Sequence, residues 1–340
     1  MDFSYKFPAV KGKQAGKQYF ITMIPLRLID RLFGNDEEYV PPEYRAQRRL
    51  NESRIPAMRD YVLNNRDSYV FSALAASIDG EFMFSPEKED HDIGILEVSM
   101  DARFMIIDGQ HRKAAIHEAL VEDASLGEET ISVVMYADEG LAHSQQMFTD
   151  LNKHAVKTSN SIAELYDSRD SLAVITRRVI NSIDFLNQYT DKERDILGKF
   201  SSNFFTLNAF YKANKKIISR YKATDEEIEK FLAEYWSTVA DHIVPWQELS
   251  NKAITKVDLR EHYIVTQAIV IQGLGFLGNK FALQFSLEDM KEKLQGLENV
   301  DWSRTANCWK KRVIRDNGKI INSTEAARCI CDVLTEVIGI

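Results

Sequence analysis

The stretch Ile106-Ile-Asp-Gly-Gln-His-Arg-Lys-Ala-Ala115 joins an apolar, β-branched run to a run of small residues. It predicts a buried strand, a turn at Asp108-Gly109 and a helix that begins directly afterwards. Gly109 permits a tight turn and a close approach of another group to the backbone. The first amides of a helix lack partners and lie at the positive end of its dipole. The turn is therefore a candidate binding site for an anion.

Two side chains of this turn add chemistry to it. Arg112 can hold a phosphate through two parallel hydrogen bonds, and His111 can act as an acid, a base or a donor near neutral pH. Cations in the first turn oppose the helix dipole by a few tenths of a kcal/mol each, roughly, and an anionic ligand would offset that cost. The structural alternative is that Asp108 caps the helix and Arg112 forms a surface ion pair.

Around this stretch, the first half of the chain predicts mixed α/β structure. We expect Tyr19–Leu28 to be an edge strand interrupted by Pro25. Tyr69–Ile78 is expected to turn at Asp79-Gly80 and to pair with Phe82–Phe84. The order strand, helix, strand from Phe104 to Tyr136 suggests a crossover unit. Further strands are expected at 93–98, 104–107 and 131–136, and helices at 45–63 and 110–120.

The second half predicts helices almost throughout. Ser161-Ile-Ala-Glu164 and Thr224-Asp-Glu-Glu227 match the capping-box pattern at a helix start. Asp316-Asn-Gly318 between apolar pairs predicts a hairpin. Strand character stops near Asn160, which gives a mixed domain over 1–160 and a helical domain over 161–340, an α+β chain. Helices are also expected at 228–239, 259–272, 287–297 and 324–338.

Composition limits the class of protein. The chain has 340 residues, of which 44% are hydrophobic and 28% charged, as in an average soluble protein of about two domains. No apolar run reaches the roughly 18 residues that span a bilayer, and the first residues lack the pattern of a secretory signal. Three cysteines that cannot all pair fit a reducing compartment, so we expect a cytoplasmic protein with no membrane partner.

Charge is unevenly distributed along this acidic chain. The net charge is −8, yet basic residues gather in three clusters. Any one cluster could be an ordinary solvated helix face, but three of them favour a surface that binds phosphates, and so double-stranded DNA. Trp302, Trp309, Tyr211 and Tyr221 lie among them and could stack on bases, although each of them taken singly is more often a packing aromatic. The predicted DNA-binding residues are Arg45, Arg48, Arg49 and Arg54; Lys212, Lys215, Lys216 and Arg220; and Lys310, Lys311, Arg312 and Arg315.

Two other sequence motifs give weaker evidence for a functional site. Gly273-Leu-Gly-Phe-Leu-Gly278 matches the dinucleotide fingerprint, with Glu298 at the distance of a ribose-binding acid. Helical rather than strand spacing precedes it, so we interpret it as a helix end followed by a turn. Cys329-x-Cys331 lies on a predicted helix, where residues two apart face different ways, and it has no second pair. No protein metal site is predicted.

Several segments together resemble one family. Asp108-Gly-Gln-His-Arg112 is the signature of DGQHR-domain proteins, and the chain resembles the DndB family of the bacterial DNA phosphorothioation system. The matches extend over nearly the whole chain. They are Ala46-Gln-Arg-Arg-Leu-Asn-Glu-Ser-Arg54 with Ile55 and Tyr61-Val62, Phe148-Thr-Asp-Leu-Asn152 with Ser159, Trp309-Lys-Lys-Arg312, and Gly318-Lys-Ile-Ile-Asn-Ser323.

This resemblance implies a fold and a ligand for the turn. The DGQHR segment is similar to the motif of the ParB/sulfiredoxin superfamily, in which a turn at a helix start holds nucleotide phosphates. It implies a ParB-like domain whose cofactor is either a nucleoside triphosphate or none. If a nucleotide binds, Mg²⁺ would enter with its phosphates and Asp108 could hold it through water. Sulfiredoxins have a cysteine where this chain has Gln110, which argues against thiol chemistry. The implied nucleotide-binding residues are Asp108, Gly109, Gln110, His111, Arg112 and Asn152.

The resemblance also implies a role in DNA sulfur modification, where such proteins act as negative regulators of the modification genes. We therefore expect a DNA-binding transcriptional repressor that acts on the promoter region of the modification operon. Its expected partners are duplex DNA, other phosphorothioation proteins and a second copy of itself. One alternative is a ParB-like nucleotide hydrolase, an ATPase or CTPase, with His111, Arg112 and Asp108 in its catalytic site. Another is a non-enzymatic scaffold for the modification enzymes.

Overall fold

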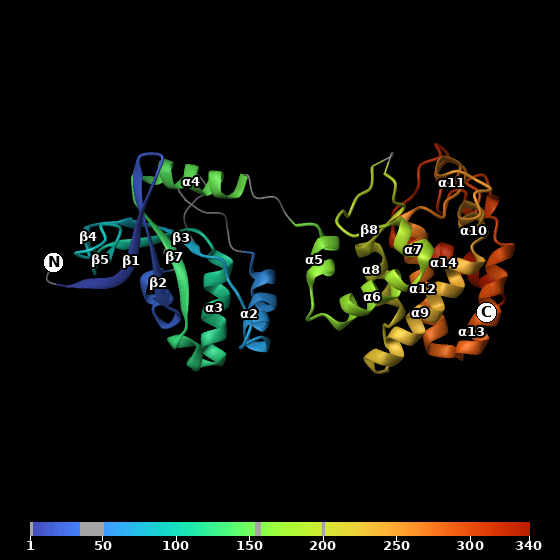
Figure 1. Ribbon diagram of the computed structural model, residues 1–340, viewed down its shortest axis with the longest axis horizontal. Coiled ribbons are helices and arrows are strands. Elements are labelled where there is room, and N and C mark those ends of the chain that lie inside the picture. Colours follow the sequence, from blue (N-terminus) through green and yellow to red (C-terminus); the bar gives the residue numbers. More distant parts are fainter. Residues whose placement is uncertain (1–2, 35–50, 154–157, 199–200) are drawn as a thin grey trace. The chain divides into compact units, whose positions relative to one another are not determined.

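The computed structural model describes residues 3–34, 51–153, 158–198 and 201–340, except for the side chains of residues 152 and 153. The chain forms two compact units, Met1–Val156 and Lys157–Ile340, here called unit 1 and unit 2 (Figure 1). Asn160, the predicted boundary, is the first residue of a helix in unit 2. No helix in these ranges is both long enough and apolar enough to cross a membrane.

Unit 1 is built on a seven-stranded sheet with the order β4-β5-β1-β2-β7-β3-β6. Neighbouring strands are antiparallel except β3 and β7, which run parallel. The mixed α/β fold predicted for this half is thus confirmed. The strands are β1 (Ser4–Gln14), β2 (Lys17–Pro25), β3 (Leu74–Asp79), β4 (Phe82–Pro86), β5 (Ile93–Ser99), β6 (Arg103–Asp108) and β7 (Thr130–Ala137).

Helices α1, α2 and α3 cover one face of this sheet. Alternate residues of the strands, such as Phe7, Phe20 and Val133, point into a core that also takes Val62 from α2 and Ile116 from α3. α4 packs against β6. The helical segments are η1 (Leu26–Leu28), α1 (Ile29–Leu32), η3 (Glu52–Arg54), α2 (Ile55–Asn64), α3 (Gln110–Glu122), η4 (Ala124–Glu128) and α4 (Leu141–Lys153).

Strand pairing in unit 1 corrects three predictions. β2 lies between β1 and β7 rather than at an edge, and Pro25 is its last residue, where a missing amide hydrogen disturbs the ladder least. β4 pairs with β5, so Phe82–Phe84 is not the partner of β3. β3 separates β6 from β7 and is antiparallel to one and parallel to the other. The strands joined by α3 therefore run in opposite directions, and the predicted crossover is wrong.

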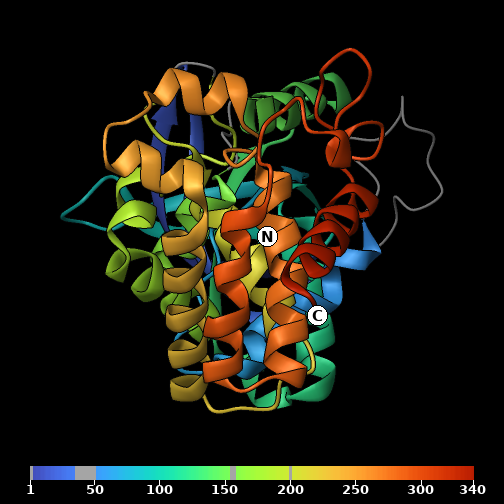
Figure 2. The same ribbon diagram turned by 90° about the vertical axis from the view of Figure 1, so that its right-hand side faces the viewer.

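Unit 2 is a bundle of helices, as predicted, with one two-stranded parallel sheet (Figure 2). Its core buries four tryptophans: Trp236, Trp246, Trp302 and Trp309. The elements are α5 (Asn160–Tyr166), α6 (Ser171–Ser182), α7 (Asp184–Tyr189), β8 (Thr190–Asp191), β9 (Phe205–Thr206), α8 (Leu207–Ile217), α9 (Asp225–His242), α10 (Val244–Ser250), α11 (Lys256–His262), α12 (Ala268–Gln284), α13 (Leu287–Leu294), η5 (Gln295–Asn299), η6 (Asn307–Trp309) and α14 (Thr324–Ile338).

The Gly273–Gly278 motif lies inside α12 and not at a helix end followed by a turn. A Cβ on Gly273 would lie 2.6 Å from Ile330 of α14, and one on Gly275 would lie 3.0 Å from the Cα of Ala213 in α8. The glycines let two neighbouring helices approach α12 closely. This packing explains the motif, and no strand precedes it to form a dinucleotide site.

Other local predictions have mixed outcomes. Thr224 and Glu227 form the predicted capping box. The other box is wrong, because Ser159 caps α5 while Ser161 is buried and bonded to Asp195. The turn at Asp316–Gly318 forms without strands, through an isolated bridge between Ile314 and Ile320. The helix expected over 45–63 is described from 55 onward, and the one expected over 259–272 divides into α11 and α12.

Candidate functional site

The Asp108–Arg112 turn has the predicted strand–turn–helix form. β6 ends at Asp108 and α3 begins at Gln110. Gly109 has φ +110°, and a Cβ there would lie 2.4 Å from the side chain of Leu74. Because L residues rarely adopt this φ and no space is left, only glycine fits without strain. Gly109 is the N-cap and no side chain caps the helix, so Asp108 does not have the capping role of the structural alternative.

Arg112 is bonded within unit 1. Its guanidinium donates to the Asp108 carboxylate at 2.6 Å, to the Ser72 carbonyl at 2.7 Å and to the Ser72 hydroxyl at 2.6 Å. It also donates to the Ala73 carbonyl at 2.5 Å. Only 14% of the side chain is exposed. Arg112 therefore ties the segment before β3 to the turn after β6, which is a stabilising role in the protein itself.

His111 connects the turn to the start of η3. Its Nε2 accepts a hydrogen bond from the backbone amide of Asn51 at 2.9 Å. An accepting Nε2 carries no proton, so a neutral ring holds its proton on Nδ1. Next to it, burial lowers the pKa of Lys113, while Asp30 acts in the opposite direction. The turn thus combines a half-buried lysine, a histidine and an arginine at the start of one helix.

The remaining predicted members of this site are only partly placed. Gln110 is the first residue of α3 and is half-buried. Asn152 belongs to the last turn of α4, but its side chain lies outside the described residues. Its expected place beside His111 therefore stays a prediction. In the described ranges, no group of three or more His, Cys, Asp or Glu side chains is arranged to hold a metal ion.

The first basic cluster is largely outside the described residues, since Arg45, Arg48 and Arg49 fall in 35–50. Arg54 is exposed on η3. Nearby, Arg59 is bonded to Asp60 at 2.7 Å and paired with Glu122 at 3.1 Å. Part of the positive charge of this segment is therefore neutralised within the fold.

The second cluster lies on and after α8. Lys212, Lys215 and Lys216 are exposed on that helix, and Arg220 is exposed directly after it. The ammonium of Lys216 lies 4.4 Å from the ring centre of Phe276 in α12. The guanidinium of Arg328 in α14 lies 5.7 Å from the same ring. Arg328 thus extends this cluster across three helices. Sequence analysis missed it because it stands alone among non-basic neighbours.

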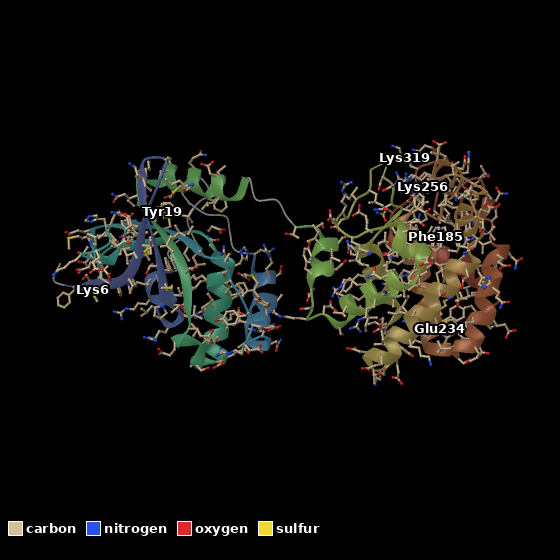
Figure 3. All side chains as sticks on the ribbon, in the orientation of Figure 1. Lys6, Tyr19, Phe185, Glu234, Lys256 and Lys319 are labelled. Carbon is tan, nitrogen blue, oxygen red and sulfur yellow. The ribbon has the colours of Figure 1, made fainter. Side chains whose placement is uncertain are left out.

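The third cluster lies on a loop before α14, here called the basic loop (residues 310–319). Lys310, Lys311, Arg312, Arg315 and Lys319 are all exposed. Figure 3 labels Lys319 on this loop. Among the described residues, none of these five side chains forms an ion pair with an acid.

The aromatic residues near the basic clusters support the core. Trp302 and Trp309 are 2% and 0% exposed and stack with ring centres 6.0 Å apart. Tyr211 donates to Asp170, and Tyr221 packs on Phe231. The prediction that the tryptophans stack on bases is therefore wrong. Their indoles fix both ends of the segment that leads into the basic loop.

Comparison with known proteins identifies the family. The model of the DndB family, described as DNA-sulfur modification-associated, matches residues 7–340. No curated protein and no solved structure matches the chain. The match covers the turn, the helical bundle and the basic loop alike. The chain therefore belongs to the DndB family of proteins associated with DNA sulfur modification.

Proposed function

We propose that this protein binds duplex DNA through the basic loop of unit 2 and represses the genes of DNA sulfur modification. The observation that carries the proposal is the exposure of five cations on the basic loop without ion pairs among the described residues. Phosphate contacts by lysine and arginine supply most of the sequence-independent affinity for DNA. The loop offers such contacts in a chain whose net charge is −8.

Cations elsewhere in the described chain are often neutralised. In unit 1, Arg66 pairs with Asp123 and Glu129, and Arg112 pairs with Asp108. In unit 2, Arg178 pairs with Glu229. A paired cation must exchange one carboxylate for a phosphate, whereas a cation of the basic loop gains a phosphate directly. The loop is therefore a better DNA-binding surface than these paired cations.

The basic loop is held in place by apolar residues within it and directly before it. Trp309, Val313 and Ile314 are buried in the core of unit 2. The Lys311 amide donates to the Ile314 carbonyl at 2.7 Å, and the Arg315 amide to the Lys319 carbonyl at 2.9 Å. Because these anchors flank the exposed cations, the charges project from a fixed backbone and less entropy is lost when DNA binds.

The repressor part of the proposal rests on the family and not on the basic loop. DndB-like proteins are associated with negative regulation of the modification genes, so the proposed target is the promoter region of that operon. Other phosphorothioation proteins are the further partners that this role implies. The α8 cluster with Arg328 is a second surface that DNA could contact.

The structure favours binding over nucleotide hydrolysis. In a hydrolase, Arg112 would neutralise the transferred phosphoryl group. Here its guanidinium already has four acceptors, and only 14% of the side chain is exposed. A nucleotide at this turn would have to displace those contacts. A scaffold without DNA affinity would leave the charge of the basic loop without a role.

Gel-shift titration of a promoter fragment at low salt tests the proposal. We expect a retarded complex with the wild-type protein, and a much weaker one when Lys311 and Arg312 are both changed to Ala. Absence of any complex at low salt would refute DNA binding. A sequence-scrambled fragment of equal length separates promoter recognition from general phosphate contact.

A further inference from the structure

The sheet of unit 1 has an unusual outer face, on the side opposite α2 and α3. An antiparallel sheet that faces water on one side normally alternates apolar residues inward and polar residues outward. Here the outward positions of four strands hold large apolar side chains that are 36–59% exposed. These residues are Val10, Ile21, Met23, Met83, Ile93 and Ile95.

Strand register places these side chains together. Val10 of β1 pairs with Ile93 of β5 on one side and with Ile21 of β2 on the other, and Ile21 pairs with Val134 of β7. Directly paired residues point to the same face. The four residues therefore form one apolar row across four neighbouring strands.

Adjacent rows continue the surface. Pro8 pairs with Ile95 in one row, and Tyr19 pairs with Tyr136 in another. The Tyr19 ring lies over Gly12, where a Cβ would be 2.3 Å from the ring. The apolar face thus extends along β1 from Pro8 to Gly12. Lys6 and Tyr19, labelled in Figure 3, lie at its two ends.

The charges at the ends of this face are balanced. Lys6 pairs with Glu97 at 3.0 Å at one end, and Lys17 pairs with Glu139 at the other. Each end therefore carries one cation and one anion. A polyanion such as DNA, or a peptide with one sign of charge, gains nothing from such a face. An identical face does, because a two-fold axis in its plane can bring one balanced pair opposite another.

We propose that this outer face is a homodimer interface, in which the unit 1 sheets of two copies stack face to face. Stacked sheets pack about 10 Å apart with their inner side chains interdigitated. From Lys6 to Gly12 the strands extend about 20 Å, and five strands about 4.8 Å apart cover about 24 Å. Two copies would bury about 1,000 Å², which is the lower limit for a specific interface. For an interface of this minimal size we expect dimerisation in the micromolar range.

Sedimentation equilibrium of the full chain without DNA tests this proposal. We expect a monomer–dimer equilibrium over a concentration range of about 1 to about 200 µM. Ile21→Glu would place two unpaired charges at the centre of the interface, and should raise the dimer dissociation constant at least about 100-fold. Ile21→Thr keeps a β-branched residue that suits a strand, and should raise it about tenfold.

A matched control separates the interface from general surface polarity. Val121→Glu changes an apolar residue that is 75% exposed at the end of α3, away from this face. It should leave the dissociation constant unchanged. Circular dichroism and melting temperature show whether each variant is folded. If Ile21→Glu fails to fold, Ile21→Thr carries the test.

A wild-type protein that stays monomeric at the highest concentration would overturn the proposal and leave the face to another partner. A dimer that Ile21→Glu and Ile21→Thr do not weaken, or that Val121→Glu weakens equally, would also overturn it. Because no DNA is present, these outcomes are independent of the DNA-binding test.

Discussion

Removing two charges from the basic loop should change the salt dependence of DNA binding by a calculable amount. Each phosphate contact releases about 0.9 counterion, so five contacts give a slope of about −4.5 in a plot of log K against log salt. Between about 50 and about 200 mM KCl, the affinity of the wild type should then fall about 500-fold. The variant Lys311→Ala/Arg312→Ala should have a slope of about −2.7 and lose only about 40-fold.

Fluorescence anisotropy with a labelled promoter duplex at four or more salt concentrations measures both slopes. Because phosphate contacts carry no sequence information, the double variant should weaken promoter and scrambled duplexes equally. The matched control is Arg178→Ala/Lys230→Ala, which removes the same charge from exposed residues of α6 and α9. The reasoning is refuted if the control flattens the slope as much as the loop variant, or if the loop variant keeps the wild-type slope.

Three further predictions concern the turn and the bundle. Gly109→Ala should lower the free energy of unfolding by about 2 kcal/mol or more in a urea titration, because φ +110° and Leu74 both oppose a Cβ; an unchanged midpoint would contradict this. Arg112→Ala should lower the free energy of unfolding by about 3 kcal/mol in the same assay, because it leaves Asp108 and the carbonyls of residues 72 and 73 unpaired. Arg112→Lys should restore only part of this stability, because an ammonium cannot bond to all of these acceptors at once as a guanidinium does. Burial raises the pKa of Glu164 to about 7, with Asp195 adding to the shift and Lys212 opposing it. The folded state therefore binds this proton more tightly than the unfolded state, and the resulting stability is lost as the pH rises from about 4.5 through about 7. Since Glu164 is only half-buried, the effect is discounted for solvent screening, and we expect Glu164→Gln to be about 1 kcal/mol more stable than the wild type at pH 8 and equal to it at pH 4.5. The exposed Glu336→Gln should show no such difference.

Local patterns predicted the elements around the turn well. The strand expected at 104–107 and the helix expected at 110–120 correspond to β6 and α3. Both follow from short-range signals, namely a β-branched run, a glycine that must turn and a run of small helix-forming residues. The Thr224 capping box was predictable for the same reason, because both of its partners lie within four residues.

Strand partners could not be predicted in this way. β4 follows β3 after a Gly80 turn, yet it pairs with β5. β2 looked like an edge strand because of Pro25, yet it lies between two strands that its inner residues help to bury. Partner choice depends on which apolar faces combine into one core, and that information is spread over the whole unit.

The same distinction between local and long-range information applies to the candidate site. Its residues were predicted, but the contacts of Arg112 with Ser72 and Ala73 join positions about forty apart in sequence and gave no local signal. Burial of Trp302 and Trp309 likewise depends on the packing of unit 2. Exposure of the loop cations, which the cations of the α8 cluster share, was a property that only the structure could supply.

These contacts bear on how the Asp108–Arg112 motif should be interpreted. Gly109 is required by backbone geometry and by Leu74, Arg112 by two carbonyls that precede β3, and Asp108 by Arg112 itself. Three of the five motif residues thus have a role in unit 1 before any ligand is considered. A loss of DNA binding in an Arg112 variant would therefore not identify a phosphate site, because the same change loosens the turn. Variants of the basic loop avoid this ambiguity, since its cations are exposed and its anchors, Trp309, Val313 and Ile314, remain unchanged.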